Sequence, residues 1–582
     1  MFKLIKQFTK KDFILILFCI ILISFGVWLD LKLPDYMSNI TRLVQTEGTK
    51  IKDVLTSGYK MLLCSFGSLV SAVVVGYMTS YISATFSKRT RKSLFEKVQS
   101  FSLEEIKKFK TSSLITRTTN DITNIQMFIS MGLQMIIKSP ITAVWAILKI
   151  LGKGWQWSLA TGISVVILLT VITFLMILVI PKFKIVQKLI DNINELTREN
   201  LNGIRVIRAF NAEKYQENKF EKANNDLTNT QIFTQKRMSI MSPLMYLIMN
   251  LLTLSIYTIG ASMLSNSGMF DRLDIFSNMV VFISYAMQVI MSFLMLAFIF
   301  IMYPRASVSA SRVNEVLDTN TKILNGNIIS SSNLGKIEFK NVSFKYPDAD
   351  EYVLEDISFK ANKGETIAII GSTGSGKSTI VNLIMRFYDV TNGEILIDDI
   401  NIKDYDTKYL YEKLGYIPQK AIMFDGSINY NISYGDKKID DKKIKNAAKI
   451  AQADEFINKM KEKYDSNVSQ GGTNISGGQK QRLSIARALA KDSEILIFDD
   501  SFSALDFKTD YTLRKELKEK ESDKTCIIVA QRVGTIINAD TIVVLDKGKI
   551  VGIGKHDELL KKCEVYKEIA LSQLSKEELY NE

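Results

Sequence analysis

The chain has 582 residues, of which 47% are hydrophobic and 23% are charged, so it is long enough for several domains rather than one core. Lysine and arginine number 74 against 61 aspartate and glutamate residues, and this net charge of +13 favours an anionic partner such as nucleic acid or the inner face of a membrane. The four cysteines have no disulfide or metal-ligand spacing, and the single histidine, His556, excludes any mechanism that needs a histidine elsewhere.

The first half of the sequence contains six stretches that are long enough to cross a membrane. Five of them have no charged residue: Phe13–Leu29, Met61–Ser87, Ser158–Ile180, Met238–Phe270 and Ile275–Pro304. The sixth, near Phe128–Ile150, is interrupted by Lys138 and Lys149. A membrane helix needs about 20 apolar residues, and this many charge-free stretches of that length argue against the buried helices of a soluble protein. We therefore predict an all-α domain of six transmembrane helices over residues 1–318.

The connecting segments predict the orientation of these helices. Met1–Asp12 carries four lysines among apolar residues, which is typical of a segment lying on the cytoplasmic leaflet. Lys88–Asp121 and Lys182–Arg237 are long and basic, so we expect both in the cytoplasm, where their helical periodicity indicates extensions of the membrane helices. Alternation of the spans then places Asp30–Lys60 outside.

Two features of the predicted spans bear on a transported substrate. Methionines recur on helical faces of the fifth and sixth spans, where promiscuous apolar recognition and lipid-facing packing both remain open. Lys138 and Lys149 lie close to three helical turns apart and share a face. Charge inside a membrane usually faces a cavity or a partner, which makes Lys138 the candidate for a substrate cavity, whereas Lys149 can also reach the outer surface with Lys153.

The second half begins after a polar segment, 319–335, and alternates short β-type runs with helices, which predicts an α/β domain over residues 336–582. The apolar strand Thr366–Ile370 opens into a loop of the pattern GxxxxGK[ST] that is followed by a helix. The loop residues are Gly371, Ser372, Thr373, Gly374, Ser375, Gly376, Lys377, Ser378 and Thr379. Its backbone N–H groups would cradle the phosphates of ATP, with Lys377 on the β- and γ-phosphates and the Ser378 hydroxyl on Mg²⁺.

Two later elements add groups to this predicted site. A polar turn opens a helix, a shape that also suits phosphate binding, and consists of Ser476, Gly477, Gly478 and Gln479. The apolar strand Ile495–Phe498 then ends in Asp499 and Asp500. Asp499 would lie where ligands of α/β sheets bind and could hold Mg²⁺ through a water, although a helix N-cap after a core strand fits the same pattern.

In this order, the six spans, the glycine-rich loop, the Ser476–Gln479 turn and the Asp499 strand resemble an ABC exporter half-transporter of the multidrug type. The resemblance covers nearly the whole chain. It implies that Thr111–Asp121 and Asn202–Phe210 are the two cytoplasmic segments that dock on nucleotide-binding domains. Nucleic acid loses support as a partner, because the cytoplasmic loops and phosphate binding account for the positive charge.

The resemblance also implies roles for single residues. Tyr346 resembles the aromatic residue that stacks on adenine, although an ordinary edge-strand tyrosine fits the same position. Gln419 resembles the glutamine that contacts Mg²⁺ and senses the membrane domain. Asp506 lies in a segment similar to the family's D-loop, which contributes to nucleotide binding.

Two positions depart from the family pattern. The family has a glutamate after the Asp499 position as the general base, and here Asp500 is one methylene shorter. Its carboxylate would sit roughly 1 to 1.5 Å back, and a misplacement of about 1 Å can cost on the order of 100-fold in rate. Gln531 replaces the switch histidine and can donate a hydrogen bond, but it cannot carry positive charge. We therefore expect slow hydrolysis at this chain's own site.

These departures resemble the degenerate-site subunit of a heterodimeric exporter. In that arrangement the chain's own loop holds ATP, and its Ser476–Gln479 turn completes a competent site on a partner half-transporter that bears the glutamate and the histidine. The resemblance implies ATP-driven export of hydrophobic or amphipathic drugs, lipids or peptides across the cytoplasmic membrane by alternating access. A homodimeric exporter or lipid flippase, and an ATP-gated channel or regulatory membrane protein, are the alternatives.

Overall fold

The computed structural model describes residues 2–574 except 47, 152, 266–267, 332–333 and 437–438. The chain divides into two compact units. The first comprises Met1–Gln99 and Ser112–Thr319, and the second comprises Ser100–Thr111 and Asn320–Glu582. The domain limits 1–318, 319–335 and 336–582 are retained as a proposal for how the sequence is organised.

The first unit is helical throughout its described residues. Its elements are η1 (Phe2–Gln7), α1 (Lys10–Gln45), α2 (Ile51–Gln99), α4 (Thr111–Thr116), the π-helical turn η2 (Arg117–Asp121), α5 (Ile122–Leu151), α6 (Trp155–Ala209), α7 (Glu213–Ser239), α8 (Met241–Ser265) and α9 (Met269–Asp318). Six helical segments of the described chain are long and apolar enough to cross a membrane, which confirms the predicted six-span domain.

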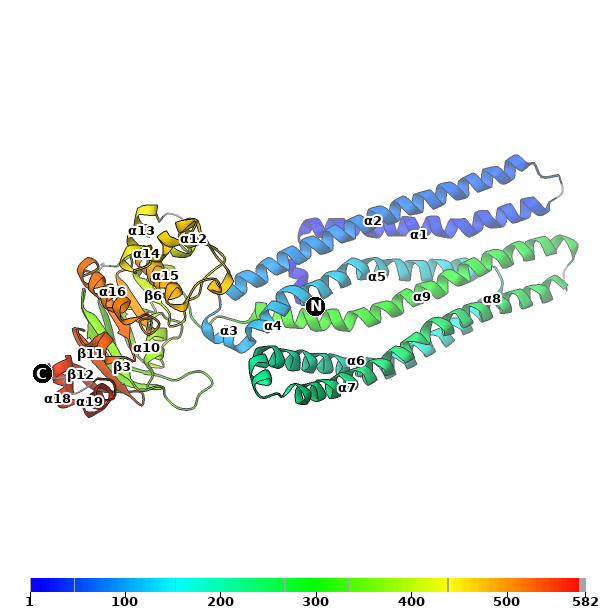
Figure 1. The fold of residues 1–582 in the computed structure, drawn as a ribbon. Helices are drawn as coiled ribbons and strands as arrows, with labels where there is room; N and C mark the ends of the chain where they lie inside the picture. The colour runs from blue at the N-terminus through cyan, green and yellow to red at the C-terminus, as the bar shows by residue number, and fades with distance from the viewer. Residues whose placement is uncertain are drawn as a thin grey trace. The chain divides into compact units, whose positions relative to one another are not determined.

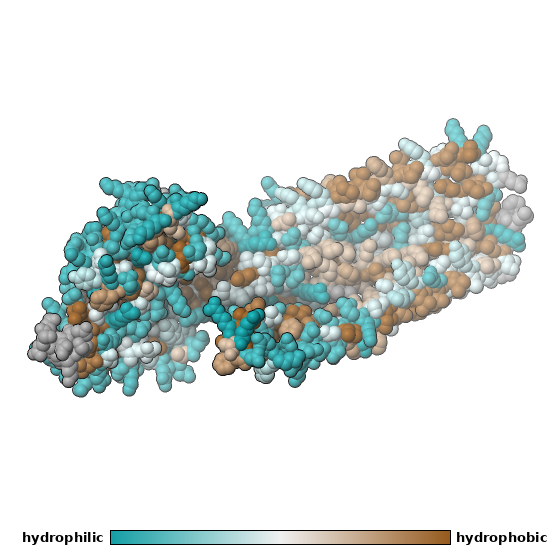
Figure 2. Space-filling model, in the orientation of Figure 1, coloured by the Kyte–Doolittle hydropathy of each residue, from teal (hydrophilic) through white to brown (hydrophobic). Residues whose placement is uncertain are grey.

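Hydrophobic side chains cover the outside of this helical unit. Figure 2 shows them in brown along the bundle, whereas the visible face of the second unit is mostly teal. Phe13, Leu62, Val166 and Leu254 are each more than half exposed although they lie on four different helices. Exposing this much apolar surface to water would be unfavourable, whereas contact with lipid tails, which are themselves apolar, is not. The surface of this unit therefore fits a lipid environment.

Within the first unit, α1 packs mainly on α2 and α5 packs mainly on α9 (Figure 1). The interior contains Trp157, Phe282 and Tyr285, all buried. The methionines noted in the sequence contribute here: Met249 is buried and Met287 packs against the same cluster. Met291, in contrast, is 43% exposed, so the methionines do not share one environment, and a role in substrate recognition stays a prediction.

The first helical hairpin is longer than the sequence predicts. The segment Asp30–Lys60 was expected to be a connection, but α1 runs on to Gln45 and α2 begins at Ile51. Helical geometry therefore continues past Leu29, where the charge-free stretch ends, because polar residues such as Asp30 find partners on neighbouring helices.

The second unit contains one helix from the first half of the chain and an α/β assembly. Its helices are α3 (Leu103–Phe109), α10 (Lys377–Ile384), α11 (Thr407–Lys413), α12 (Ile428–Ile432), α13 (Asp441–Ile450), α14 (Asp454–Lys459), η3 (Lys463–Asp465), η4 (Gln470–Gly472), α15 (Gly477–Ala490), α16 (Phe507–Lys520), α17 (Val533–Ile536), α18 (His556–Lys562) and α19 (Glu564–Leu571). Its strands are β1 (Ile337–Phe344), β2 (Leu354–Ala361), β3 (Thr366–Gly371), β4 (Asn392–Ile397), β5 (Ile400–Asn401), β6 (Leu414–Ile417), β7 (Gly426–Ser427), β8 (Asn467–Val468), β9 (Ile495–Asp499), β10 (Thr525–Val529), β11 (Thr541–Asp546) and β12 (Lys549–Gly554).

A six-stranded sheet in the order β12-β11-β3-β10-β9-β6 forms the centre of this unit. All neighbours in it are parallel except the edge pair β11 and β12. Alternate residues of β9 face opposite layers: Ile495 and Ile497 meet the layer of α10, while Leu496 and Phe498 meet the layer of α13 and α15. A sheet covered on both faces explains the continuous apolar runs of its strands and confirms the predicted α/β fold.

The docking segment expected at Thr111–Asp121 is displaced in the chain. The residues grouped with the α/β assembly are Ser100–Thr111, whereas those after Thr111 belong to the helical unit. In this segment α3 is started by a capping box between Ser102 and Glu105, and Leu103 packs against the apolar cluster of the α/β assembly. The resemblance therefore placed the first docking segment about one helix too late.

Candidate nucleotide-binding site

The parallel strands bring three chain segments to one edge of the central sheet. In the register of β3, β10 and β9, Val529 lies opposite both Ile369 and Asp499. The carboxyl ends of parallel strands meet at the same sheet edge, which is where α/β folds bind ligands. The glycine-rich loop after β3, Asp500 after β9 and Gln531 after β10 are thereby neighbours.

The glycine-rich loop wraps around the ammonium group of Lys377. Its Nζ donates hydrogen bonds to the carbonyl oxygens of Gly371 and Ser372, both at 2.8 Å. Gly376 has a φ of 99°, and a Cβ there would lie 2.5 Å from a methyl carbon of Leu354, so the turn requires glycine. Burial lowers the pKa of Lys377 from its usual value, against the opposing effect of the nearby carboxylates. The charge is held by neutral carbonyl groups that a phosphate could replace.

Ser378 and Asp499 provide adjacent oxygen atoms beside this loop. The Ser378 hydroxyl donates to Asp499 Oδ1 at 3.3 Å, and burial is the main cause that raises the pKa of Asp499. Among the described residues, no cluster of three or more His, Cys, Asp or Glu side chains could hold a metal. The two oxygen atoms of Ser378 and Asp499 are of the kind that binds Mg²⁺, which proteins commonly hold with one or two side-chain oxygens while substrate phosphates and waters complete the shell.

Asp500 is the point where the two departures from the family pattern meet. Its Oδ2 accepts hydrogen bonds from Gln419 Nε2 at 3.0 Å and from Gln531 Nε2 at 2.8 Å. Asp500 is 8% exposed and has a φ of 48°, a left-handed conformation that aspartate tolerates better than most residues. Two amide donors use both lone pairs of this oxygen, so only Oδ1 remains to accept a proton from a water.

Tyr346 lies beside the start of α10. Its hydroxyl is 3.2 Å from Thr379 Oγ1, and its ring meets the Tyr388 ring edge to face at 5.3 Å. The ammonium of Lys107 on α3 lies 5.2 Å from the Tyr346 ring centre and 5.5 Å from that of Tyr388. Of these three residues only Tyr346 was predictable, because Tyr388 follows α10 without any motif and Lys107 lies in the first half of the chain.

The remaining predicted residues start helices. Ser476 and Gln479 form a capping box at α15, with the exposed glycine Gly477 in its first turn. Asp506 caps α16 by accepting from Thr509, which lowers its pKa below the usual value. Contacts of these residues with a nucleotide bound by another subunit remain predictions. His556 is buried at the start of α18, where its Nδ1 lies 2.7 Å from the Tyr566 hydroxyl.

The first unit holds a second set of charged groups, in which the two predicted lysines meet aspartates of α1. Lys138 on α5 pairs with Asp30 of α1 at 3.4 Å, and Lys149 pairs with Asp35 of α1 at 2.8 Å. Tyr285 of α9 donates to Asp35 at 2.6 Å. Both lysines therefore have an acidic partner on α1 that the sequence analysis did not name, and the substrate-cavity role of Lys138 stays a prediction. The aspartates went unnoticed because they were assigned to a connection.

Comparison with known proteins gives matches over both units. The family described as "ABC transporter transmembrane region" matches residues 15–293, and "ABC transporter" matches residues 354–503. The uncharacterized ABC transporter ATP-binding protein YfiB of Bacillus subtilis is 35% identical over 90% of this chain and 91% of its own length. The ATP-dependent lipid A-core flippase of Haemophilus influenzae is 31% identical over 90% and 91%.

A solved structure gives the same picture of the fold. A bacterial Atm1-family ABC exporter with ATP bound superposes with a TM-score of 0.83 and covers 95% of this chain and 98% of its own. Its sequence identity is 24%, so the likeness concerns the fold alone.

Proposed function

This chain belongs to the ABC transporter family, and on that premise we propose that it is the degenerate-site half of a heterodimeric ATP-driven exporter. Membership makes it a multi-pass membrane protein with a soluble ATP-binding domain, whose ATPase activity is coupled to transport and whose relatives work as dimers. Our proposal goes beyond family membership in three respects: one subunit hydrolyses ATP faster than the other, hydrolysis at this chain's own site is slow, and the substrates are hydrophobic or amphipathic.

The observation that carries the proposal is the arrangement around Asp500. One of its carboxylate oxygens is held by two glutamine amides at 3.0 and 2.8 Å. A general base must accept a proton from the attacking water, and geometry errors of about 1 Å can cost on the order of 100-fold in rate. Gln531 also lacks the positive charge with which a histidine could stabilise the transferred phosphoryl group. Both groups that would act on the water or γ-phosphate are thus weakened together.

The binding part of the site has no comparable weakness. Lys377 and the loop backbone would hold the β- and γ-phosphates, and Tyr346, whose hydroxyl is 3.2 Å from Thr379 Oγ1, would lie close enough to the loop to contact adenine. Ser378 and Asp499 fit Mg²⁺, and Gln419 could contribute its amide oxygen. When bound, the metal would neutralise negative charge on the phosphates. Because this ATP would be bound tightly and hydrolysed slowly, it would hold the two nucleotide-binding domains together for a long time.

Transport would follow from the difference in affinity between two arrangements of the dimer. ATP favours the closed pair of nucleotide domains because it bridges them, and hydrolysis at the partner's competent site removes one bridge. The membrane helices would then expose their cavity alternately to each side. Hydrophobic or amphipathic compounds such as drugs, lipids or peptides are the proposed substrates.

A homodimeric lipid exporter is the second candidate. It is favoured by the similarity over 90% of the chain to a protein named as a lipid A-core flippase. A homodimer would contain two sites with Asp500 and Gln531, and would therefore turn over slowly without any other subunit.

Phosphate release by the purified full-length chain tests the proposal. We expect slow release from the isolated chain, and an increase of about 10- to 100-fold in the Asp500→Glu/Gln531→His variant, because this restores the family's base and cation. Lys377→Ala serves as the zero-activity control. Rapid, sustained release from the unmodified chain with no other subunit present would overturn the degenerate-site assignment. Slow release together with lipid transport in vesicles would favour the homodimer.

A further inference from the structure

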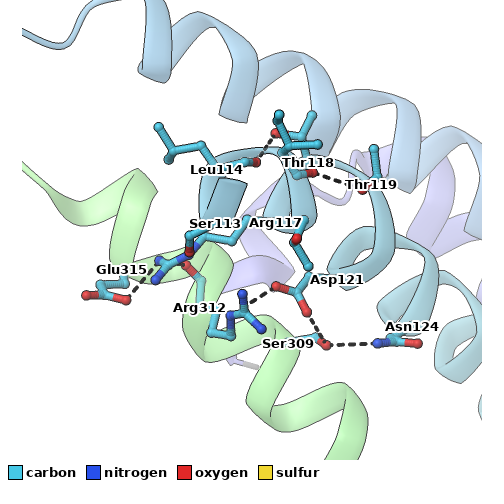
Figure 3. Close-up of polar contacts among 12 residues, drawn as sticks. Ser113, Leu114, Arg117, Thr118, Thr119, Asp121, Asn124, Ser309, Arg312 and Glu315 are labelled. Carbon is cyan, nitrogen blue, oxygen red and sulfur yellow. Dashed lines mark hydrogen bonds and ion pairs between the residues drawn. The ribbon is translucent and has the colours of Figure 1, made fainter. Parts of the chain in front are cut away.

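A cluster of charged side chains connects two helices of the first unit near their ends (Figure 3). Arg117 and Asp121 are the first and last residues of the π-helical turn η2, which lies between α4 and α5. Their partners Ser309, Arg312 and Glu315 lie within the last ten residues of α9. A π-turn inside a longer helix is rare and often marks a functional position.

Arg117 contacts α9 in two ways. Its Nη1 lies 2.8 Å from Glu315 Oε2, and the same nitrogen donates to the carbonyl oxygen of Arg312 at 2.7 Å. The Nε donates back to Ser113 on α4 at 3.2 Å. The guanidinium group is therefore fixed in orientation by partners on both helices.

Asp121 makes the complementary contacts. Its Oδ2 lies 3.2 Å from Arg312 Nε, and its Oδ1 accepts from the Ser309 hydroxyl at 2.8 Å. Asn124 of α5 donates to the same hydroxyl at 3.2 Å. Figure 3 shows that all these side chains point into one seam between the helices. The seam therefore holds two ion pairs, Arg117 with Glu315 and Asp121 with Arg312, and η2 contributes the buried member of each.

The function of these contacts can be inferred from the burial of Arg117 and Asp121. The side chains of Arg117 and Asp121 are 10% and 6% exposed, while those of Arg312 and Glu315 are 39% and 52% exposed. Apolar side chains of similar volume often stabilise a buried position as well as or better than an ion pair. Ion pairs, however, permit only one register of the two helices, because a shift of one turn leaves buried charges without partners. Fixing that register is therefore the function that the burial favours.

The seam also lies beside two of the places where the chain passes between its compact units. The chain leaves the first unit after Gln99, returns after Thr111 and leaves again after Thr319. Arg117 is six residues beyond the second of these passages, and Glu315 is four residues before the third. The cluster therefore joins α5 and α9 at the ends through which each is covalently connected to the nucleotide-binding unit.

We propose that the Arg117–Asp121–Arg312–Glu315 cluster is a coupling joint that makes α5 and α9 move as one lever when nucleotide binds. This inference rests on the proposed function only in so far as it requires nucleotide binding to change the membrane helices. The two helices carry Lys138, Lys149 and Tyr285 farther along, where they contact α1. A movement of α5 and α9 that starts at the joint would therefore also change the contacts of these three residues with α1.

Hydrogen–deuterium exchange of the full-length protein, with and without the non-hydrolysable analogue AMP-PNP and Mg²⁺, tests the joint. The readout is the nucleotide-induced change in exchange of α5 and α9 peptides around residues 138–150 and 275–290. Arg117→Glu and Glu315→Arg should each reduce this change at least about fivefold, the lower end of typical coupling between sites. The double variant Arg117→Glu/Glu315→Arg should recover most of it, because the ion pair is restored with reversed signs. AMP-PNP should still bind to every variant at the concentration used, so that a smaller exchange change is not caused by an empty site.

The matched control is an exposed ion pair at the same end of α9. Lys3 pairs with Asp318 at 2.7 Å, with side chains 68% and 52% exposed, so Lys3→Glu removes a pair there without touching the seam. This variant should behave like the unmodified protein. The joint is refuted if the double variant fails to recover the change, if the single variants leave it intact, or if nucleotide produces no change in the unmodified chain. Loss of AMP-PNP binding by the unmodified chain would instead refute the proposed function.

Discussion

Charged groups are held in opposite ways in the two units. In the nucleotide site, Lys377 is bonded to two carbonyl oxygens and Asp499 to a serine hydroxyl, so neutral partners hold their charges. In the helical unit, Asp35 and Asp121 each lie within 3.2 Å of a cationic side chain. A charged side chain that is held only by neutral groups can still bind a charged ligand. A charged side chain that is paired with an opposite charge instead fixes the orientation of the helices that carry the pair. Substitutions should therefore affect ligand binding in one unit and helix arrangement in the other.

The largest expected effect is the loss of nucleotide binding in Lys377→Ala. Removing the ammonium group leaves the phosphates without their central cation, and charged hydrogen bonds of this kind contribute about 1.5 to 3 kcal/mol each. We expect ATP affinity to fall by about 10- to 100-fold, measured by titration with a fluorescent ATP analogue. The thermal midpoint without nucleotide should change little, because Lys377 has no charged hydrogen-bond partner in the loop. A large loss of stability without nucleotide would show that Lys377 is a structural residue.

Much of the nucleotide site was predictable because its residues follow directly from strands of the sheet. The loop Gly371–Thr379 comes directly after β3, and Asp499 is the last residue of β9. Each could therefore be recognised from a short stretch of sequence. The convergence of Gln419 and Gln531 on Asp500 was not predictable. It depends on β9 lying between β10 and β6 in the sheet, and on side-chain conformations that no motif specifies.

In the helical unit, the number of spans was predictable from length and hydrophobicity, but the partners of its charges were not. Asp35 and Lys149 are 114 residues apart, and Arg117 and Glu315 are farther still. Hydrophobic periodicity says which residues form helices but not which helices are neighbours. The pairing of Lys149 was missed for this reason: a lysine considered alone is best placed at the membrane surface, while a paired lysine need not be.

A smaller effect, on stability rather than binding, is expected at Asp35. Lys149→Met removes the charged hydrogen bond and leaves the carboxylate with the Tyr285 hydroxyl and the nearby charge of Lys153, and we expect the free energy of unfolding to fall by about 1.5 to 3 kcal/mol. Thermal unfolding in detergent, followed by tryptophan fluorescence, measures this change. Nucleotide affinity should be unaffected.

The control for Asp35 is an exposed pair on the same helix. Arg42 and Asp274 lie 3.2 Å apart with both side chains 56% exposed, so Arg42→Met should cost no more than about 1 kcal/mol. In addition, the double variant Asp35→Asn/Lys149→Met should be less destabilised than the sum of its single variants, because each single change leaves the other group unpaired. Equal effects of Lys149→Met and Arg42→Met would contradict an orienting role for the half-buried pair of Asp35 and Lys149.

The smallest effect on stability is expected at Lys138, because its ion pair is more exposed than that of Lys149 and its charge is therefore partly available to a ligand. Its ammonium lies 3.4 Å from Asp30 Oδ2, with side chains 42% and 30% exposed, and Ser68 also donates to that aspartate. A pair this open contributes about 0 to 1 kcal/mol, so Lys138→Ala should unfold nearly as the unmodified protein does. Because the pair is weak, a ligand with an anionic group could compete for Lys138, and the variant should change the relative transport rates of anionic and neutral hydrophobic dyes in vesicles. Lys138→Arg keeps the cation and should retain the original preference. Unchanged rates for every dye in Lys138→Ala would place Lys138 with the orienting charges of the helical unit rather than with those available to a ligand.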